Sequence, residues 1–173
     1  WEVPAVFRTR LGAAVGRQRV MAADGHLLLL LHVPPGPDET ERQARFIWRK
    51  PDGTWISNDL GGGPQVVGKH LEQFAKAIQD CGVWEEQAKT AEDYFAVLER
   101  LAPLQRSARN LHGVLQEARQ SCPDDRELIN LRDRAYEIER TAELQQTETK
   151  NSLDLLMVKK AEEQAKSSRR MAA

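Results

Sequence analysis

Few residues of this 173-residue sequence stand at spacings that would support chemistry. Residues 63–70 come nearest, because their glycines and Lys69 almost match a phosphate-binding loop. In such a loop the residue after the lysine is Ser or Thr, whose hydroxyl binds Mg²⁺, whereas here it is His70. We therefore expect no nucleotide site, and we interpret residues 61–63 as a glycine turn that leads into a helix.

The histidines and cysteines also lack the spacing of a reactive site. The four histidines are His26, His32, His70 and His112. They form no pair at metal-ligand spacing, and no Ser or Cys lies in a nucleophile elbow. Cys81 and Cys122 form no CxxC motif, which fits a reducing compartment, and we interpret both as buried thiols. We expect a protein that is not an enzyme and holds no cofactor tightly.

Charge and hydropathy argue against a nucleic-acid-binding protein and against a membrane-spanning segment within the chain. The net charge is -1, so no overall field attracts the chain to nucleic acid, and we expect no nucleic-acid partner. The longest apolar run, residues 27–31, is much shorter than the roughly 20 residues that span a bilayer. We expect the chain as given to be soluble. Because it begins at Trp1 and ends at Ala173 within a helical pattern, we also expect both ends to be cut.

The first sixty residues carry strand patterns. The predicted strands are residues 6–11, 18–21, 26–33, 44–50 and 54–58. The third is almost entirely apolar, so it should be covered on both faces. The last two flank Pro51-Asp52-Gly53, a turn sequence typical of a hairpin, and the proline-rich residues 34–38 predict a loop. A small sheet should result.

From Pro64 onward the apolar period is that of a helix. One amphipathic helix is expected to end near Gly82, and a second should begin at Thr90, whose hydroxyl can cap the amide of Asp93. Pro103 should interrupt it, with a third helix over residues 104–120.

The fifty residues after Pro123 contain no Pro or Gly. This pattern predicts one continuous helix over residues 125–170. At 1.5 Å per residue it would be about 75 Å long, so we expect it to leave the domain. The predicted fold is α+β: a domain of residues 1–122 with a small sheet and packed helices, and a long projecting stalk helix over residues 123–173.

The stalk carries an apolar stripe at three-four spacing that weakens in its middle. The stripe comprises Leu128, Leu131, Ala135, Ile138 and Ala142, and the weak part comprises Gln145, Thr149 and Ser152. The stripe fits a stalk packed on several neighbours, and it equally fits a soluble coiled-coil protein-interaction module. The last turns are rich in Lys and Arg, as expected beside the cytoplasmic end of a membrane helix, although a solvated charged end gives the same pattern.

The stalk segment resembles the CorA family of divalent-cation transporters. The resemblance rests on Leu131-Arg132-Asp133, on the long uninterrupted helix that follows, and on Leu155-Leu156 within it. Upstream, residues 17–26 with their apolar strand and residues 93–95 are similar to the family's strand and to the start of its helical part.

The resemblance implies the cytoplasmic regulatory and stalk domain of a Mg²⁺-type transporter or channel at the inner membrane. The full-length protein would be a homopentamer that contacts the membrane only through C-terminal helices outside this chain. This fragment would be a monomer or small oligomer. By position, Asp133 matches a stalk carboxylate that holds a divalent cation between protomers, and Ser168 and Met171 match residues that line the pore entrance.

Several positions depart from the family pattern. A second stalk acid falls on Tyr136, which leaves the adjacent Glu137 as the second expected metal ligand. The acidic pair that should face Asp133 from a neighbouring protomer falls on Arg8-Thr9. We therefore expect an interprotomer contact between Arg8 and Asp133, in which a guanidinium replaces the bridging Mg²⁺.

Overall fold

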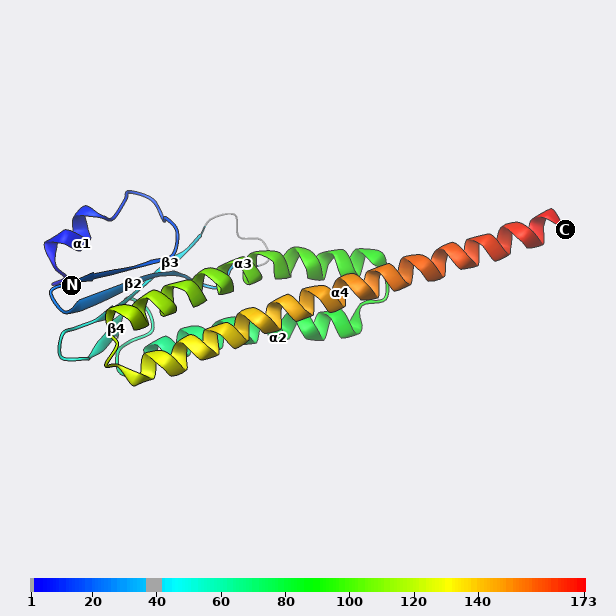
Figure 1. The fold of residues 1–173 in the computed structure, drawn as a ribbon. Coiled ribbons are helices and arrows are strands. Elements are labelled where there is room, and N and C mark those ends of the chain that lie inside the picture. The colour runs from blue at the N-terminus through cyan, green and yellow to red at the C-terminus, as the bar shows by residue number, and fades with distance from the viewer. Residues whose placement is uncertain (1, 37–41) are drawn as a thin grey trace.

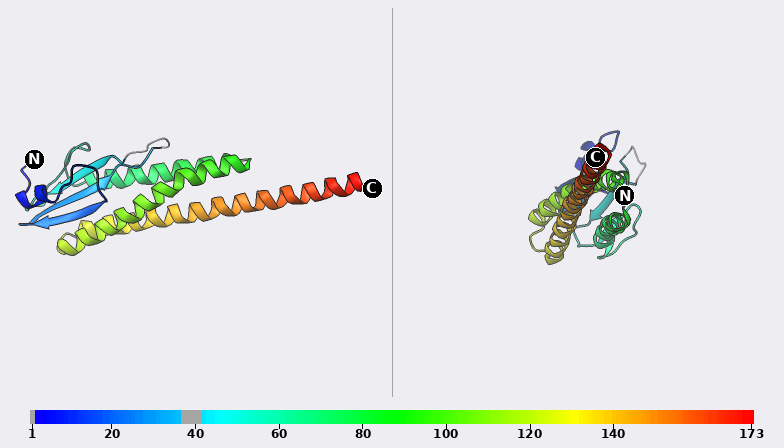
Figure 2. Two further views of the ribbon diagram at one scale, coloured as in Figure 1. Left: turned by 90° about the horizontal axis from the view of Figure 1, so that it is seen from above. Right: turned by 90° about the vertical axis from the view of Figure 1, so that its right-hand side faces the viewer.

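The computed structural model describes residues 2–36 and 42–173 as successive layers (Figure 1). A short N-terminal helix, α1 (Ala5–Thr9), lies on one face of a small sheet. Three longer helices lie on the other face, and the last of them continues far beyond the rest of the molecule (Figures 1 and 2). The α+β fold class and the long projecting helix are therefore confirmed.

The sheet has four antiparallel strands in the order of the sequence. The strands are β1 (Arg19–Ala23), β2 (His26–His32), β3 (Ala44–Arg49) and β4 (Trp55–Ser57). Asp24 and Gly25, with φ of 52° and 79°, form the two-residue turn between β1 and β2. Positive φ at both positions is what a tight hairpin turn of this length needs. The predicted hairpin of β3 and β4 is also present.

Strand β2 is buried on both faces, as its apolar run predicts. Leu27, Leu29 and Leu31 belong to the core cluster beneath the helices. Leu28 and Leu30 belong to a smaller cluster on the other face, which α1 covers. Side chains of a strand alternate between faces, so five consecutive leucines supply both cores at once.

The strand predicted at residues 6–11 is wrong, because residues 5–9 form α1. Pro4 precedes the helix and Phe7 is fully buried against the outer face of the sheet. A proline before the first turn is compatible with helix, and one buried aromatic residue can anchor a helix of this length. Five residues are too few for their apolar period to separate a helix from a strand.

Two predicted helix ends are also wrong. Helix α2 spans Val66–Gln87 and continues through Gly82, where a Cβ atom would come within 3.1 Å of Gln145 Oε1 on the last helix. The glycine therefore serves close packing and does not end the helix. Helix α3 spans Ala91–Ser121 without a break at Pro103. Leu101 and Leu104 are fully buried on either side of the proline, so core packing outweighs the lost backbone hydrogen bond.

Helix α4 (Arg126–Ala172) is continuous, as predicted. Asp125 caps it by accepting a hydrogen bond from the Glu127 amide, while its other carboxylate oxygen accepts one from Arg49 of β3 at 3.0 Å. The stripe predicted to face neighbouring stalks instead packs within the chain, in the same cluster as the helices α2 and α3 and the sheet. Residues 123–153 thus belong to the core, and only the later turns of α4 project from it.

Candidate functional site

The most exposed part of the molecule is the projecting end of α4, residues 154–172 (Figure 1). Leu153 is the last buried residue of the helix, and nearly every residue after it is exposed. The exposed fractions of Leu155 and Val158 are 56% and 55%, and that of Met171 is 86%. Within the described residues, this segment is a helix without a packing partner.

The projecting end has two distinct sides. Met157, Ala161, Ala165, Ser168 and Ala172 recur at spacings of four, four, three and four residues, so they share one uncharged face of small or apolar side chains, which begins one turn after Asp154 on the same side of the helix. The long charged side chains lie elsewhere around the helix: Lys159, Lys160, Glu162, Glu163, Lys166, Arg169 and Arg170. Small residues on one face allow two helices to approach closely. We call this face the small-residue face.

Such a segment is marginal as an isolated helix in water, because helices of this length owe most of their stability to packing. Here it elongates from a folded base, which removes the nucleation cost. No Pro or Gly interrupts it. The small-residue face is therefore exposed on a formed helix, where it can pack against another surface.

The predicted metal ligands Asp133 and Glu137 lie one turn apart on the exposed side of α4. The side chain of Asp133 is 60% exposed, and its Oδ1 accepts a hydrogen bond from Arg132 Nη2 at 2.9 Å. Mg²⁺ takes six oxygen ligands, several of them water. No group of three or more His, Cys, Asp or Glu residues that could hold a metal occurs in residues 2–36 and 42–173.

The other predicted positions are spread over the molecule. Arg8 lies on α1, across the sheet from α4, so one chain does not bring it to Asp133. Ser168 lies on the small-residue face, and Met171 lies beside it near the end of α4. Contact between Arg8 and Asp133 was predicted between two protomers, and it stays a prediction.

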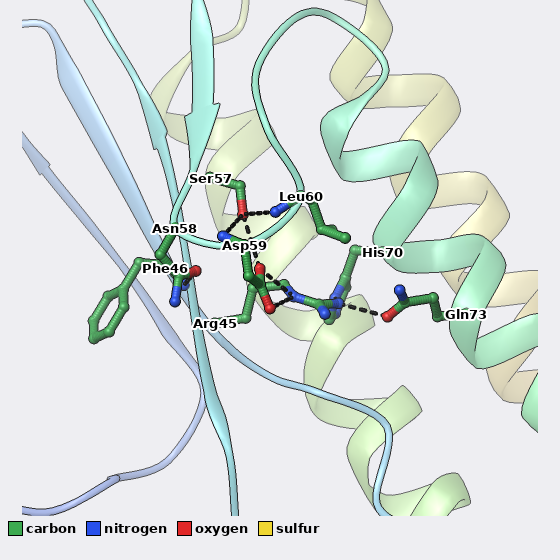
Figure 3. Close-up of polar contacts among 8 residues, drawn as sticks. All are labelled: Arg45, Phe46, Ser57, Asn58, Asp59, Leu60, His70 and Gln73. Atoms are coloured by element: carbon green, nitrogen blue, oxygen red, sulfur yellow. Dashed lines mark hydrogen bonds and ion pairs between the residues drawn. The ribbon is translucent and has the colours of Figure 1, made fainter.

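A buried polar network lies at the other end of the helical layer, between β3, the segment after β4 and the start of α2 (Figure 3). Arg45 is 4% exposed and donates through Nε to both carboxylate oxygens of Asp59, at 2.9 and 3.1 Å. Its Nη1 lies 2.8 Å from His70 Nδ1 and donates to Gln73 Oε1 at 2.7 Å. Ser57 Oγ donates to Asp59 at 3.1 Å.

The network contains Ser, His and Asp, yet its geometry is not that of a nucleophilic triad. His70 faces Arg45, so its imidazole is not aligned with the Ser57 hydroxyl. Burial, with the positive charge of Arg45 as the second cause, lowers the pKa of His70 to about 3. A base with that pKa stays neutral and weak at physiological pH. The arrangement instead fastens the segment after β4 to α2.

Sequence reasoning did not identify this network. Its members come from three elements, and the periodicity of each element shows only that His70 shares the buried face of α2 with Leu71 and Phe74. A histidine at helical spacing among apolar residues was the available signal. Arg45, which is two residues from Ile47 and so shares its face of β3, was the second.

Within the described ranges, no helix combines the length and apolar character needed to cross a membrane. No protein-family model matches the sequence, and no curated protein is similar to it.

Proposed function

We propose that this chain is the cytoplasmic regulatory and stalk domain of a CorA-like, homo-oligomeric divalent-cation transporter. The observation that carries the proposal is the exposed small-residue face at the projecting end of α4. In the proposed assembly, the α4 helices of several copies pack through this face around a common axis. The sheet and the base of the helical layer lie outside the bundle.

The charge of the projecting end supports the same arrangement. Its last two turns carry Lys166, Arg169 and Arg170, and these side chains lie off the small-residue face. Basic residues are enriched on the cytoplasmic side of membrane helices. Copies that pack through the uncharged face therefore keep their cations on the outside of the bundle.

The carboxylates near the base of α4 supply the regulatory part of the proposal. Asp133 and Glu137 are exposed, and each chain provides too few ligands for Mg²⁺ alone, so an ion would sit between copies. A second arrangement satisfies Asp133 without metal: Arg8 of the neighbouring copy would donate to it. Both arrangements use exposed residues and change assembly without changing the fold.

Disulfide trapping tests whether the small-residue face is the interface. We expect Ala165→Cys, in a Cys122→Ser background, to form crosslinked dimers under mild oxidation at high protein concentration. Cys81 is fully buried and can remain. Lys159→Cys is the matched control, because it is equally exposed on the charged side of the same helix. Equal crosslinking of the two variants, or none, would contradict the proposed bundle.

Titration with Mg²⁺ separates the regulatory arrangements. If Mg²⁺ bridges copies, millimolar Mg²⁺ should increase crosslinking of Ala165→Cys, and Asp133→Ala should abolish the increase while Glu163→Ala, on the charged side of α4, should not. If Arg8 replaces the ion, crosslinking should be independent of Mg²⁺ and should fall in Arg8→Ala. Crosslinking that responds to none of these changes would favour the alternative function, a coiled-coil protein-interaction module that uses the same face of α4.

A further inference from the structure

A pocket of about 490 Å³ lies between β1, the segment before it and the middle of α3. Four arginines line it: Arg10, Arg17, Arg19 and Arg109. Glu117 is the only acidic residue among its lining residues. The chain as a whole has a net charge of -1, so this concentration of positive charge is local. We call this site the basic pocket.

The backbone of the basic pocket is held in place by hydrogen bonds. The Arg19 guanidinium donates to the carbonyl oxygens of Arg17 and Arg10, at 3.1 and 3.2 Å. The buried side chain of Gln18 donates to the carbonyl of Ser107 on α3 at 3.0 Å and accepts from the backbone amide of His32 at 3.3 Å. These hydrogen bonds join Arg10 and Arg17 to Arg19 within one segment, and they join this segment to α3, which forms the opposite wall of the pocket.

Two of the arginines remain available to a ligand. In residues 2–36 and 42–173, no side-chain hydrogen bond or ion pair engages the guanidinium groups of Arg10 and Arg17, and both residues are exposed. Arg109 lines the opposite wall from α3; its side chain is 63% exposed, and its Nε lies 3.6 Å from the less exposed Glu139 in a long ion pair. Guanidinium groups from two walls of one pocket therefore concentrate positive charge at a site that is open to an anion.

Gly113 leaves part of one wall of the basic pocket without a side chain. It lies within α3 and lines the basic pocket. A Cβ atom there would meet no other atom within 4 Å, so packing inside the chain does not require glycine. Glycine destabilises a helix interior relative to alanine. The open space beside Gly113 is available to a ligand in the pocket.

We propose that the basic pocket binds a small, soluble polyphosphate anion. The planar guanidinium fork matches two phosphate oxygens at once, and arginines on opposite walls suit a ligand with more than one phosphate group. The volume exceeds that of a single phosphate and falls within the range of about 300–1,000 Å³ typical of small-molecule sites. The proposal is independent of the proposed stalk function, since no pocket residue lies on α4.

Calorimetric titration with inorganic tripolyphosphate tests the proposal on the whole chain. We expect one anion bound per chain. The double variant Arg10→Ala/Arg17→Ala should bind at least about tenfold more weakly, because two charge-assisted donors are lost. The backbone carbonyls that Arg19 uses remain in this variant. Gly113→Leu should weaken binding without changing the net charge, because its side chain would take up space that the glycine leaves open beside the pocket.

Arg169→Ala/Arg170→Ala is the control, since it removes the same charge from the far end of α4. We expect its affinity to equal that of the wild type. Equal losses in the two double variants would show unspecific attraction and overturn the proposal, as would a wild-type chain that does not bind tripolyphosphate. Binding only to phosphatidic acid vesicles would overturn it in favour of a lipid surface. Thermal unfolding of each variant confirms that lost binding is not lost folding.

Discussion

At the residue scale, the protonation states in the Arg45 network depend on which groups have hydrogen-bond partners. Burial alone would raise the pKa of Asp59, but the hydrogen bonds and positive charge of Arg45 together with the hydrogen bond from Ser57 outweigh it, so the pKa is lowered. His70 accepts a hydrogen bond from Arg45 at Nδ1, so Nε2 carries the proton, and this buried N–H has no acceptor in the described part of the chain. A charged imidazole would therefore be costly, and the native state keeps His70 neutral.

This neutrality predicts a stability that depends on pH. The pKa of His70 falls from 6.5 to about 3 on folding, so below about pH 6.5 the unfolded chain binds a proton that the folded chain does not. The free energy of unfolding should be highest above pH 6.5 and decrease as the pH falls toward 3. Urea unfolding at pH 7.5 and pH 5 should show a lower midpoint at pH 5.

His70→Gln should reduce that difference, because glutamine does not titrate. Part of the difference should remain, since burial also lowers the pKa of His32. His26→Gln, on the other side of the sheet, is the control and should retain the wild-type difference. A His70→Gln protein with an unchanged pH dependence would show that the His70 imidazole is not kept neutral.

At the element scale, helix ends follow local chemistry where the chain is exposed and packing where it is buried. Thr90 accepts a hydrogen bond from the Asp93 amide, and the Asp93 carboxylate accepts from the amide of Thr90 in return. This reciprocal cap sets the start of α3. The same helix passes through Pro103, and α2 passes through Gly82, because both positions lie among core contacts.

We expect Thr90→Ala to lower the free energy of unfolding by about 1 kcal/mol, because the Asp93 amide loses its acceptor. Thr147→Ala is the control: its hydroxyl donates to the Glu143 carbonyl in the middle of α4. There alanine has the higher helix propensity, so stability should stay the same or rise by up to about 0.7 kcal/mol. Chemical denaturation measures both, and similar losses in the two variants would argue against the cap.

At the scale of the whole molecule, the division of α4 into a packed half and a projecting half is the main feature. Leu128 and Leu131 lie in one cluster with Leu29 of the sheet and Phe74 of α2. Arg49 ties the sheet to Asp125 at the start of α4. The base of the stalk and the sheet should therefore unfold together.

Leu128→Ala tests this coupling, because Leu128 is fully buried. We expect a loss of about 2–5 kcal/mol. In a Trp1→Phe/Trp84→Phe background, tryptophan fluorescence reports Trp48 and Trp55 of the sheet, and it should shift to the same lower midpoint as the far-ultraviolet circular dichroism of the helices. Separate midpoints for the two signals would show that α4 unfolds as an independent unit.

Removal of the projecting half should leave the stability nearly unchanged, in contrast to Leu128→Ala. A chain that ends at Leu156 loses only residues that are exposed. Its free energy of unfolding should differ from that of the full chain by less than about 0.5 kcal/mol. A large loss of stability would mean that residues 157–173 pack on the core.

The sequence alone determined the apolar strand β2, the hairpin of β3 and β4, the cap at Thr90 and the uninterrupted helix α4, because each depends on local period or turn chemistry. It also predicted that Asp133 and Glu137 lie on one helix, and the structure shows that both are exposed. The tertiary structure alone decided that residues 5–9 are helical, that the stripe of α4 faces its own chain, and that Arg45, Asp59 and His70 meet. Periodicity defines which face of an element is apolar, whereas the surface that covers this face depends on contacts between residues distant in sequence.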